Sequence, residues 1–235
     1  MVQQLSRICD LCVLMTCMNC LLTASTIKEI TPFLDYYRKA HQKWPSGVSL
    51  DVLITGIGLT ATAYNLTKHI GIKHPDLVIQ AGVAGCFDKS IPLGTVLAVK
   101  QDAIADECVI EMNKLKTLFS LNLVPRNQVP YQNGWLVNPG KALLKKTRFR
   151  SVHGISVNQI TTATRVVQFY KDKFNPVTET MEGAALHYVC LMEKIPFLQI
   201  RSISNYIGER NKKNWNLKQS ILNLNNELIS LINKI

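Results

Sequence analysis

The chain has 235 residues, of which 47% are hydrophobic and 18% charged, and its formal net charge at pH 7 is +11. The apolar content excludes an intrinsically disordered chain, and the length suits a single large α/β domain that buries a substantial core. The sequence contains no uninterrupted apolar run of about 18 residues, the length that a membrane-spanning helix needs.

The positive charge is compatible with nucleic-acid binding. However, the basic residues do not interleave with aromatic residues, and they form no known DNA-reading motif. The densest basic run, residues 141–150, is predicted to end a helix whose Leu143, Leu144 and Phe149 face inward. We therefore interpret the charge as a solvated basic face, which also attracts anionic small molecules.

Seven cysteines stand at positions 9, 12, 17, 20, 86, 108 and 190. The last three are isolated among apolar residues, which is typical of reduced, buried thiols and predicts a cytoplasmic protein. The first four follow the pattern C-x2-C-x4-C-x2-C, which resembles the spacing of metal ligands. Because the central gap is short for a structural zinc site and no histidine lies nearby, no metal site is predicted there.

Residues 1–17 are predicted to be an N-terminal extension outside the fold. The apolar run after Arg7 is interrupted by Asp10, and no clear signal-peptide cleavage site follows it. Met18 directly precedes a good first buried strand, so one domain is expected to span residues 18–235.

Strands and helices alternate along this domain. Strands are predicted at about 19–24, 51–55, 77–81, 95–99, 152–157, 177–180 and 197–204, and helices at about 27–43, 60–70, 141–146, 164–173, 183–193 and 217–232. Residues 101–139 are predicted to be a long excursion that covers a site or a subunit contact, with helical pieces near 113–120. The alternation predicts an α/β fold: a single three-layer αβα domain with a central mixed, largely parallel sheet.

Glycine-rich segments follow two of the predicted strands. Residues 56–58 read Gly-Ile-Gly and residues 82–85 read Gly-Val-Ala-Gly, and both are predicted to be turns at strand ends. Glycine there lets the backbone approach a ligand and offers free N–H donors, although ordinary tight turns explain it equally well. A dinucleotide fingerprint is excluded because position 61 is alanine and the turn follows the second strand.

Two acids and one arginine also stand near predicted strand ends. Glu182 lies at a strand-to-helix junction, where the helix dipole favours a negative charge. With Glu29 and Arg201, it suits a reaction in which water is deprotonated while a sugar becomes cationic. The alternatives are that Glu182 only complements the helix dipole, and that Glu29 is a surface charge or a partner of Arg201.

The order and spacing of four motifs resemble the purine nucleoside phosphorylase and nucleosidase superfamily. These motifs are Gly-Ile-Gly (56–58), Ala-Gly-Val-Ala-Gly (81–85), Met-Glu-Gly-Ala-Ala (181–185) and Arg-Ser-Ile-Ser-Asn (201–205). Within the superfamily the chain most resembles the futalosine hydrolases, the nucleosidases of the alternative menaquinone pathway, through residues 22–34, 156–158 and 204–216. The methylthioadenosine/adenosylhomocysteine nucleosidases share the scaffold.

The resemblance implies a nucleoside site without a cofactor or a metal, in a homodimer or larger homo-oligomer. Catalytic roles are implied for Glu29, which would activate water, for Glu182, which would accept hydrogen bonds from the ribose hydroxyls, and for Asn205, which would face the N7 and position-6 edge of the purine. Substrate-binding roles are implied for Gly58, Ala84 and Gly85 along the ligand, Ile160 and Thr161 at the purine, Met181 at the ribose and Arg201 beside the carboxylates.

Two departures from the superfamily pattern refine this expectation. Phosphorylases usually carry an arginine just before the second glycine segment, where this chain has Gln80-Ala81, so water is the expected nucleophile. Adenine-releasing nucleosidases carry aspartate where this chain has Asn205, and an amide can donate to a 6-keto oxygen or to N7. An amide is no general acid, so protonation of the departing purine is left to water or to hydrogen bonding.

We therefore predict hydrolysis of the N-glycosidic bond of futalosine to hypoxanthine and dehypoxanthinyl futalosine. The alternatives are a methylthioadenosine/adenosylhomocysteine nucleosidase and a purine nucleoside phosphorylase. A rival from another class is a basic nucleic-acid-binding protein on an enzyme scaffold, against which the set of Glu29, Glu182 and Arg201 argues.

Overall fold

The computed structural model describes residues 18–39 and 47–234. The predicted N-terminal extension, residues 1–17, lies outside the described residues, and so do Cys9, Cys12 and Cys17 of the cysteine motif. The domain boundary at Met18 therefore stays a prediction.

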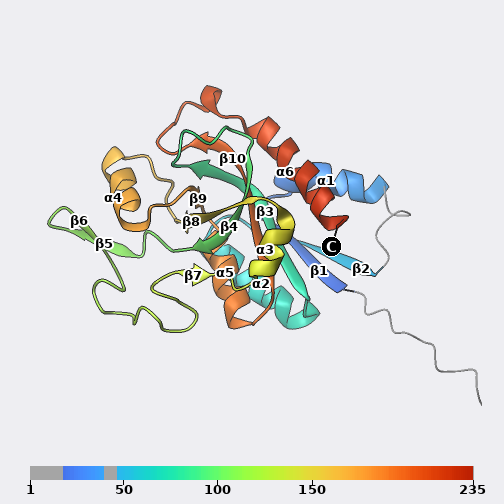
Figure 1. Cartoon of the computed structure of the whole chain (residues 1–235), viewed down its shortest axis with the longest axis horizontal. Helices are drawn as coiled ribbons and strands as arrows, with labels where there is room; N and C mark the ends of the chain where they lie inside the picture. The colour runs from blue at the N-terminus through green and yellow to red at the C-terminus, as the bar shows by residue number, and fades with distance from the viewer. Residues whose placement is uncertain (1–17, 40–46, 235) are drawn as a thin grey trace, which may run out of the picture.

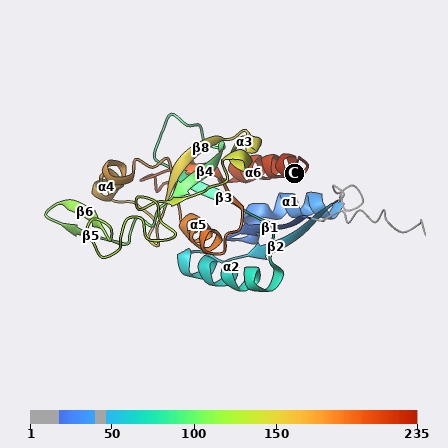
Figure 2. The same cartoon turned by 60° about the horizontal axis from the view of Figure 1, so that its bottom comes forward.

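The described chain forms three layers, with a central sheet between two groups of helices (Figures 1 and 2). Helices α1, α3 and α6 lie on one face and helices α2 and α5 on the other (Figure 2). The helices are α1 (Ile27–Lys39), α2 (Leu59–Lys73), α3 (Lys141–Thr147), α4 (Thr164–Phe174), α5 (Gly183–Met192) and α6 (Leu217–Ile232). This arrangement confirms the predicted three-layer α/β domain.

The strands are β1 (Met18–Ala24), β2 (Val48–Ile54), β3 (Leu77–Cys86), β4 (Val96–Asp102), β7 (Leu136–Val137), β8 (Arg150–Ser156), β9 (Thr178–Thr180) and β10 (Phe197–Tyr206). Strand β3 is central, because it pairs in parallel with β1 and β10 and antiparallel with β9. Pairings of β10 with β4, β4 with β8 and β8 with β9 close a circuit back to β3. The predicted mixed, largely parallel sheet is confirmed, and the elements that carry the candidate site converge on β3.

The prediction of a turn at residues 82–85 is wrong, because these residues continue strand β3 to Cys86. The parallel strand β10 runs beside them, and Arg201 is the register partner of Gly82. Glycine at 82 has a packing reason: a Cβ there would collide with the Arg201 guanidinium and lie 2.9 Å from Glu29 Oε1. The glycine therefore makes room for two charged side chains rather than for a bend.

The prediction of helical pieces near residues 113–120 is also wrong. Strands β5 (Cys108–Glu111) and β6 (Lys114–Thr117) form a small antiparallel hairpin beside helix α4 (Figure 1). Met112 and Asn113 make the turn with φ values of 47° and 62°, the left-handed conformation that two-residue hairpin turns require. The long excursion itself is confirmed, since it separates β4 from β7.

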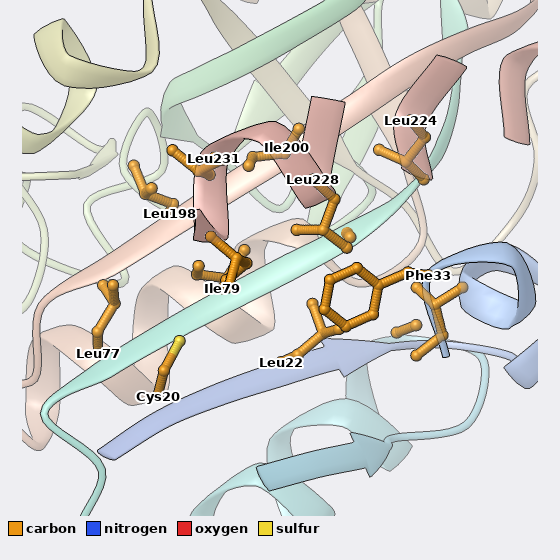
Figure 3. Close-up of a cluster of buried hydrophobic side chains, with 14 of the residues drawn as sticks. Cys20, Leu22, Phe33, Leu77, Ile79, Leu198, Ile200, Leu224, Leu228 and Leu231 are labelled. Carbon is orange, nitrogen blue, oxygen red and sulfur yellow. The ribbon is translucent and has the colours of Figure 1, made fainter. Parts of the chain in front are cut away.

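Two apolar clusters hold the helices to the sheet. On one face, Phe33 of α1 and Leu228 of α6 pack with Leu22 and Ile79 of the sheet, and all four are fully buried (Figure 3). On the other face, residues of α2, α5, β1, β3 and β10 form a second cluster, made of Leu21, Leu66, Ile70, Val78, Leu186, Val189, Cys190 and Phe197. Burying one such side chain stabilises the fold by about 1.5–3 kcal/mol.

Within the described residues, no helix combines the length and the apolar character needed to cross a membrane.

A buried amide links helix α6 to the first turn of α1, where Glu29 lies. Asn225 of α6 is fully buried; its Oδ1 accepts from the backbone N–H of Phe33 at 2.9 Å, and its Nδ2 donates to the backbone oxygen of Glu29 at 2.8 Å. Pro32 stands inside the same helix and has no N–H to donate. Asn225 thus joins the two backbone groups that a regular helix would pair with each other.

Replacing Asn225 by leucine should lower the free energy of unfolding by about 2–4 kcal/mol, because two buried backbone groups of α1 lose their partner. Asn226→Leu is the matched control, since Asn226 is exposed on the same helix. Urea unfolding of both variants measures the difference. An equal effect of the two substitutions would contradict the anchoring role of Asn225.

Candidate active site

Glu29 is held in a fixed position by four donors. It lies in the first turn of α1 and is only 8% exposed. Its Oε2 accepts from Ser25 Oγ at 2.6 Å and from the backbone N–H and hydroxyl of Thr26 at 3.0 and 3.1 Å. Its Oε1 accepts from the backbone N–H of Val83 at 3.1 Å, which ties α1 to strand β3. A carboxylate oriented in this way can receive a proton at a defined place.

Glu182 lies where two helices begin. It is the N-cap residue of α5, it is 6% exposed, and its Oε1 accepts from the backbone N–H of Gly58, the N-cap residue of α2, at 3.2 Å. Burial raises the pKa of Glu182 above its ordinary value and nearby Glu29 raises it further, whereas Arg201 and the Gly58 N–H oppose the shift. The two helix dipoles also favour the carboxylate form. Glu29 is therefore close enough to raise the pKa of Glu182.

Arg201 is the cation of the cluster, and it is completely buried. Its Nη2 donates to Gln80 Oε1, and its Nη1 lies beside Gly82. In the described part of the chain, Arg201 forms no direct ion pair with Glu29 or Glu182. Its influence on Glu182 acts through the electrostatic field, which is strong where water is excluded.

Asn205 presents a donor toward β3. Its Oδ1 accepts from Ser204 Oγ at 2.8 Å, and its Nδ2 donates to the backbone oxygen of Tyr206 at 3.3 Å. A Cβ added to Gly85 would lie 3.5 Å from that Nδ2. The amide nitrogen therefore borders the surface of Gly85, and it keeps a hydrogen for a further acceptor.

The remaining predicted residues lie on the same elements or in adjoining loops. Ala84 and Gly85 are in β3, and Met181 directly precedes Glu182. Ile160 is 48% exposed, and Thr161 next to it is buried and donates its backbone N–H to Glu179 at 3.1 Å. The structure thus groups Glu29, Gly58, Glu182 and Arg201 tightly, and it places Ala84, Gly85, Ile160, Thr161, Met181 and Asn205 around the end of β3. The roles of these residues stay predictions.

A family model described as the phosphorylase superfamily matches residues 24–232. The chain belongs to this superfamily. Membership confirms the predicted fold. The relatives named as nucleosidases and hydrolases, described next, support the predicted enzyme class, an N-glycosyl hydrolase.

Two relatives of the superfamily are each 24% identical to this chain. One is named 5'-methylthioadenosine/S-adenosylhomocysteine nucleosidase, from Buchnera aphidicola subsp. Schizaphis graminum, and the match covers 76% of this chain and 77% of the relative. The other is named futalosine hydrolase, from Thermus thermophilus, and the match covers 81% of this chain and 85% of the relative. Both names therefore occur at the same identity, and the substrate has to be argued from the site.

Solved structures of the superfamily share the fold. A 5'-methylthioadenosine/S-adenosylhomocysteine nucleosidase from Helicobacter pylori superposes with a TM-score of 0.77 at 18% identity, covering 93% of this chain and 99% of the other. The native futalosine hydrolase of the same species gives 0.76 at 18% identity, with the same coverage.

A buried acid that was not predicted from the sequence, Asp102, lies against the first residue of α5. Asp102 at the end of β4 is fully buried, and its Oδ1 accepts from Ser156 Oγ at 3.0 Å and from the backbone N–H of Ala103 at 2.8 Å. A Cβ at Gly183, the first residue of α5, would collide with Asp102 Oδ2 and with Gln199. The sequence signal that could have indicated Asp102 is an acidic residue at the end of an apolar strand. In residues 18–39 and 47–234, no group of three or more acidic, histidine or cysteine side chains is arranged to hold a metal ion.

Burial raises the pKa of Asp102 from 3.8 to about 6, although Gln199, Ser156 and Arg201 oppose the shift. The raised pKa means that the protonated carboxyl stabilises the fold below about pH 4, and that this contribution is lost as the pH rises through about 6.

Asp102→Asn should remove this dependence, because the amide keeps an oxygen for Ser156 and Ala103. Between pH 4 and 7.5 the wild type should lose about 2 to 3 kcal/mol of stability relative to the variant. Chemical unfolding at both pH values measures this loss, with Asp35→Asn on the exposed face of α1 as control. Parallel pH profiles for wild type and Asp102→Asn would refute the assignment.

Proposed function

We propose that this enzyme hydrolyses the N-glycosidic bond of futalosine and releases hypoxanthine. The observation that carries the proposal is the pair of buried carboxylates, Glu29 and Glu182, which are fixed by backbone donors from β3 and α2 and lie in the field of a buried arginine. A nucleoside hydrolase needs two such acids: one to accept a proton from water, and one to hold sugar hydroxyls while positive charge develops on the ring.

In the proposed reaction, Glu29 takes a proton from a water molecule whose oxygen bonds to the anomeric carbon of the ribose. The bond between that carbon and the purine nitrogen breaks, and its electron pair leaves with the base. Glu182 accepts hydrogen bonds from the ribose hydroxyls, and its negative charge stabilises the oxocarbenium-like state. The departing purine takes a proton from solvent and Glu29 returns its proton to solvent, so the OH of the attacking water ends on the sugar and one hydrogen ends on the base.

The surroundings of Arg201 support water rather than phosphate as the nucleophile. Gln80 is only 1% exposed and accepts a hydrogen bond from Arg201 Nη2. A neutral amide at this position adds no positive charge for a phosphate ion, and it uses one of the guanidinium donors.

Asn205 supports a 6-oxopurine. Because Ser204 donates to the amide oxygen, the amide nitrogen is the atom that borders Gly85. An N–H donor suits a 6-keto oxygen or N7, whereas it has no partner on a 6-amino group. The alternative substrate is methylthioadenosine or adenosylhomocysteine, after which several relatives are named.

Glu29→Gln should lower kcat for hypoxanthine release by about 10²- to 10⁴-fold, because the amide cannot accept a proton from water. Glu182→Gln should lower it by a similar factor, because the negative charge beside the cationic sugar is lost. Glu193→Gln, at the exposed end of α5, is the control and should retain wild-type activity. The assay follows the base released from futalosine, methylthioadenosine and inosine, with and without phosphate. Near-normal turnover by either site variant would refute the mechanism, and phosphate-dependent release would indicate a phosphorylase.

Asn205→Asp should shift the preference from 6-oxopurine toward 6-aminopurine nucleosides. The carboxylate accepts from an amino group and is repelled by a keto oxygen, so we expect the ratio of the two kcat/KM values to change by about 10- to 100-fold. An unchanged ratio would mean that another contact discriminates the base.

A further inference from the structure

A second buried acid, Glu179, is not used by the proposed reaction. It is the middle residue of β9 and only 6% exposed. Its Oε1 accepts from the backbone N–H of Thr161 at 3.1 Å, while its Oε2 is buried without a hydrogen-bond partner in the described part of the chain. A buried acceptor without a donor is costly, so its retention calls for an explanation.

Glu179 shares one face of the sheet with Asn205. Gly85 is the register partner of Glu179 on one side and of Asn205 on the other. Register partners project their side chains to the same face, and Gly85 has none to place between the two. Two interstrand spacings separate the backbones of Glu179 and Asn205 by about 10 Å, a span that suits a fused bicyclic base bonded at opposite edges.

An aliphatic side chain, that of Ile207, lies against Gly85. The Cδ1 atom of Ile207 rests against Gly85, where it would collide with an added Cβ. Ile207 is half-buried and belongs to the same apolar cluster as Ile155, the other register partner of Glu179. An aliphatic side chain at this place can pack against the flat face of an aromatic base, while the polar atoms at either side bind its edges.

We infer that Glu179 binds the six-membered-ring edge of the base, with Oε2 accepting the N1–H of a 6-oxopurine while Asn205 Nδ2 donates to the opposite edge. This inference rests on the proposed function and names the chemistry by which the site selects its base. Hypoxanthine carries a hydrogen at N1, and adenine carries a lone pair there. A carboxylate oxygen binds the first and repels the second.

The electrostatics of Glu179 are consistent with this pairing. Burial raises the pKa of the Glu179 carboxyl, the side chain and the backbone N–H of Thr161 oppose the shift, and nearby Asp106 adds to it. A second N–H donor from the base would compensate the desolvated charge, whereas a base without that hydrogen would leave it uncompensated. The discrimination then comes from the cost of an unpaired group as much as from the bond itself.

Glu179→Gln separates this role from a merely structural one. The glutamine oxygen can still accept from the backbone N–H of Thr161, so the segment that contains Thr161 stays bound to β9. An NH₂ group replaces Oε2, however, and it presents a donor to the base where the wild type presents an acceptor. Glu193→Gln, distant from the base, is the matched control.

The test measures by calorimetry the binding of hypoxanthine, 1-methylhypoxanthine and adenine to wild type and both variants. Wild type should bind hypoxanthine at least about 10-fold more tightly than 1-methylhypoxanthine, and Glu179→Gln should reduce that ratio and gain affinity for adenine. The bulk of the methyl group acts on both proteins, so the difference between their ratios isolates the hydrogen bond. The wild-type preference for hypoxanthine over adenine needs no variant, and its absence would overturn the inference even if Glu179→Gln does not fold.

Equal ratios in wild type and Glu179→Gln would overturn the inference, and so would wild type that prefers adenine. The proposed function is judged separately by the base that wild type releases. Hypoxanthine release with equal ratios refutes the role of Glu179 alone, whereas release of adenine alone refutes the proposed substrate.

Discussion

The candidate site depends on one electrostatic constraint: a fully buried guanidinium, Arg201, lies beside strand β3 and near two buried carboxylates. A charge in the interior persists only if opposite charges and hydrogen-bond partners compensate its lost hydration. Gly82 permits this arrangement, because any side chain there would displace Arg201 and crowd Glu29. In the proposed reaction, the buried charges thus lie where positive charge develops on the sugar, which is the arrangement that stabilises a cationic transition state.

The scaffold explains why these charges keep their places. The apolar clusters hold helices to both faces of the sheet, and Asn225 joins α6 to the turn of α1 that carries Glu29. The N-termini of α2 and α5 meet at Glu182, so two separate helices orient one carboxylate. Each acid is therefore fixed by backbone groups of a different element, and a proton acceptor placed in this way needs little reorganisation during catalysis.

Much of this could be predicted from the sequence, because the strand and helix periods are regular and the motifs lie at strand ends. The first strand, the last helix and the approach of Glu29, Glu182 and Arg201 all follow from local pattern and resemblance. The β5–β6 hairpin was missed because Met112, the first of its two turn residues, adopts a left-handed conformation that methionine rarely takes. Asp102 was missed because its environment is made by distant segments, α5 and β10, which packing alone brings to it.

A register shift in β10 shows how a local irregularity can set specificity. Between Ile203 and Asn205 the pairing with β3 skips one residue, so Asn205 rather than Ser204 stands opposite Gly85. Bulges of this kind redirect side chains next to functional sites. Without the shift, the Ser204 hydroxyl would take the place of Asn205 in the proposed base site. A hydroxyl can both donate and accept, so it would discriminate weakly between bases. The shift instead presents an amide nitrogen, oriented by that same serine, across Gly85 from the Glu179 carboxylate. In the inferred site, a donor directed at N7 and an acceptor directed at N1 match a base that carries a hydrogen at N1, and the acceptor opposes a base that has a lone pair there.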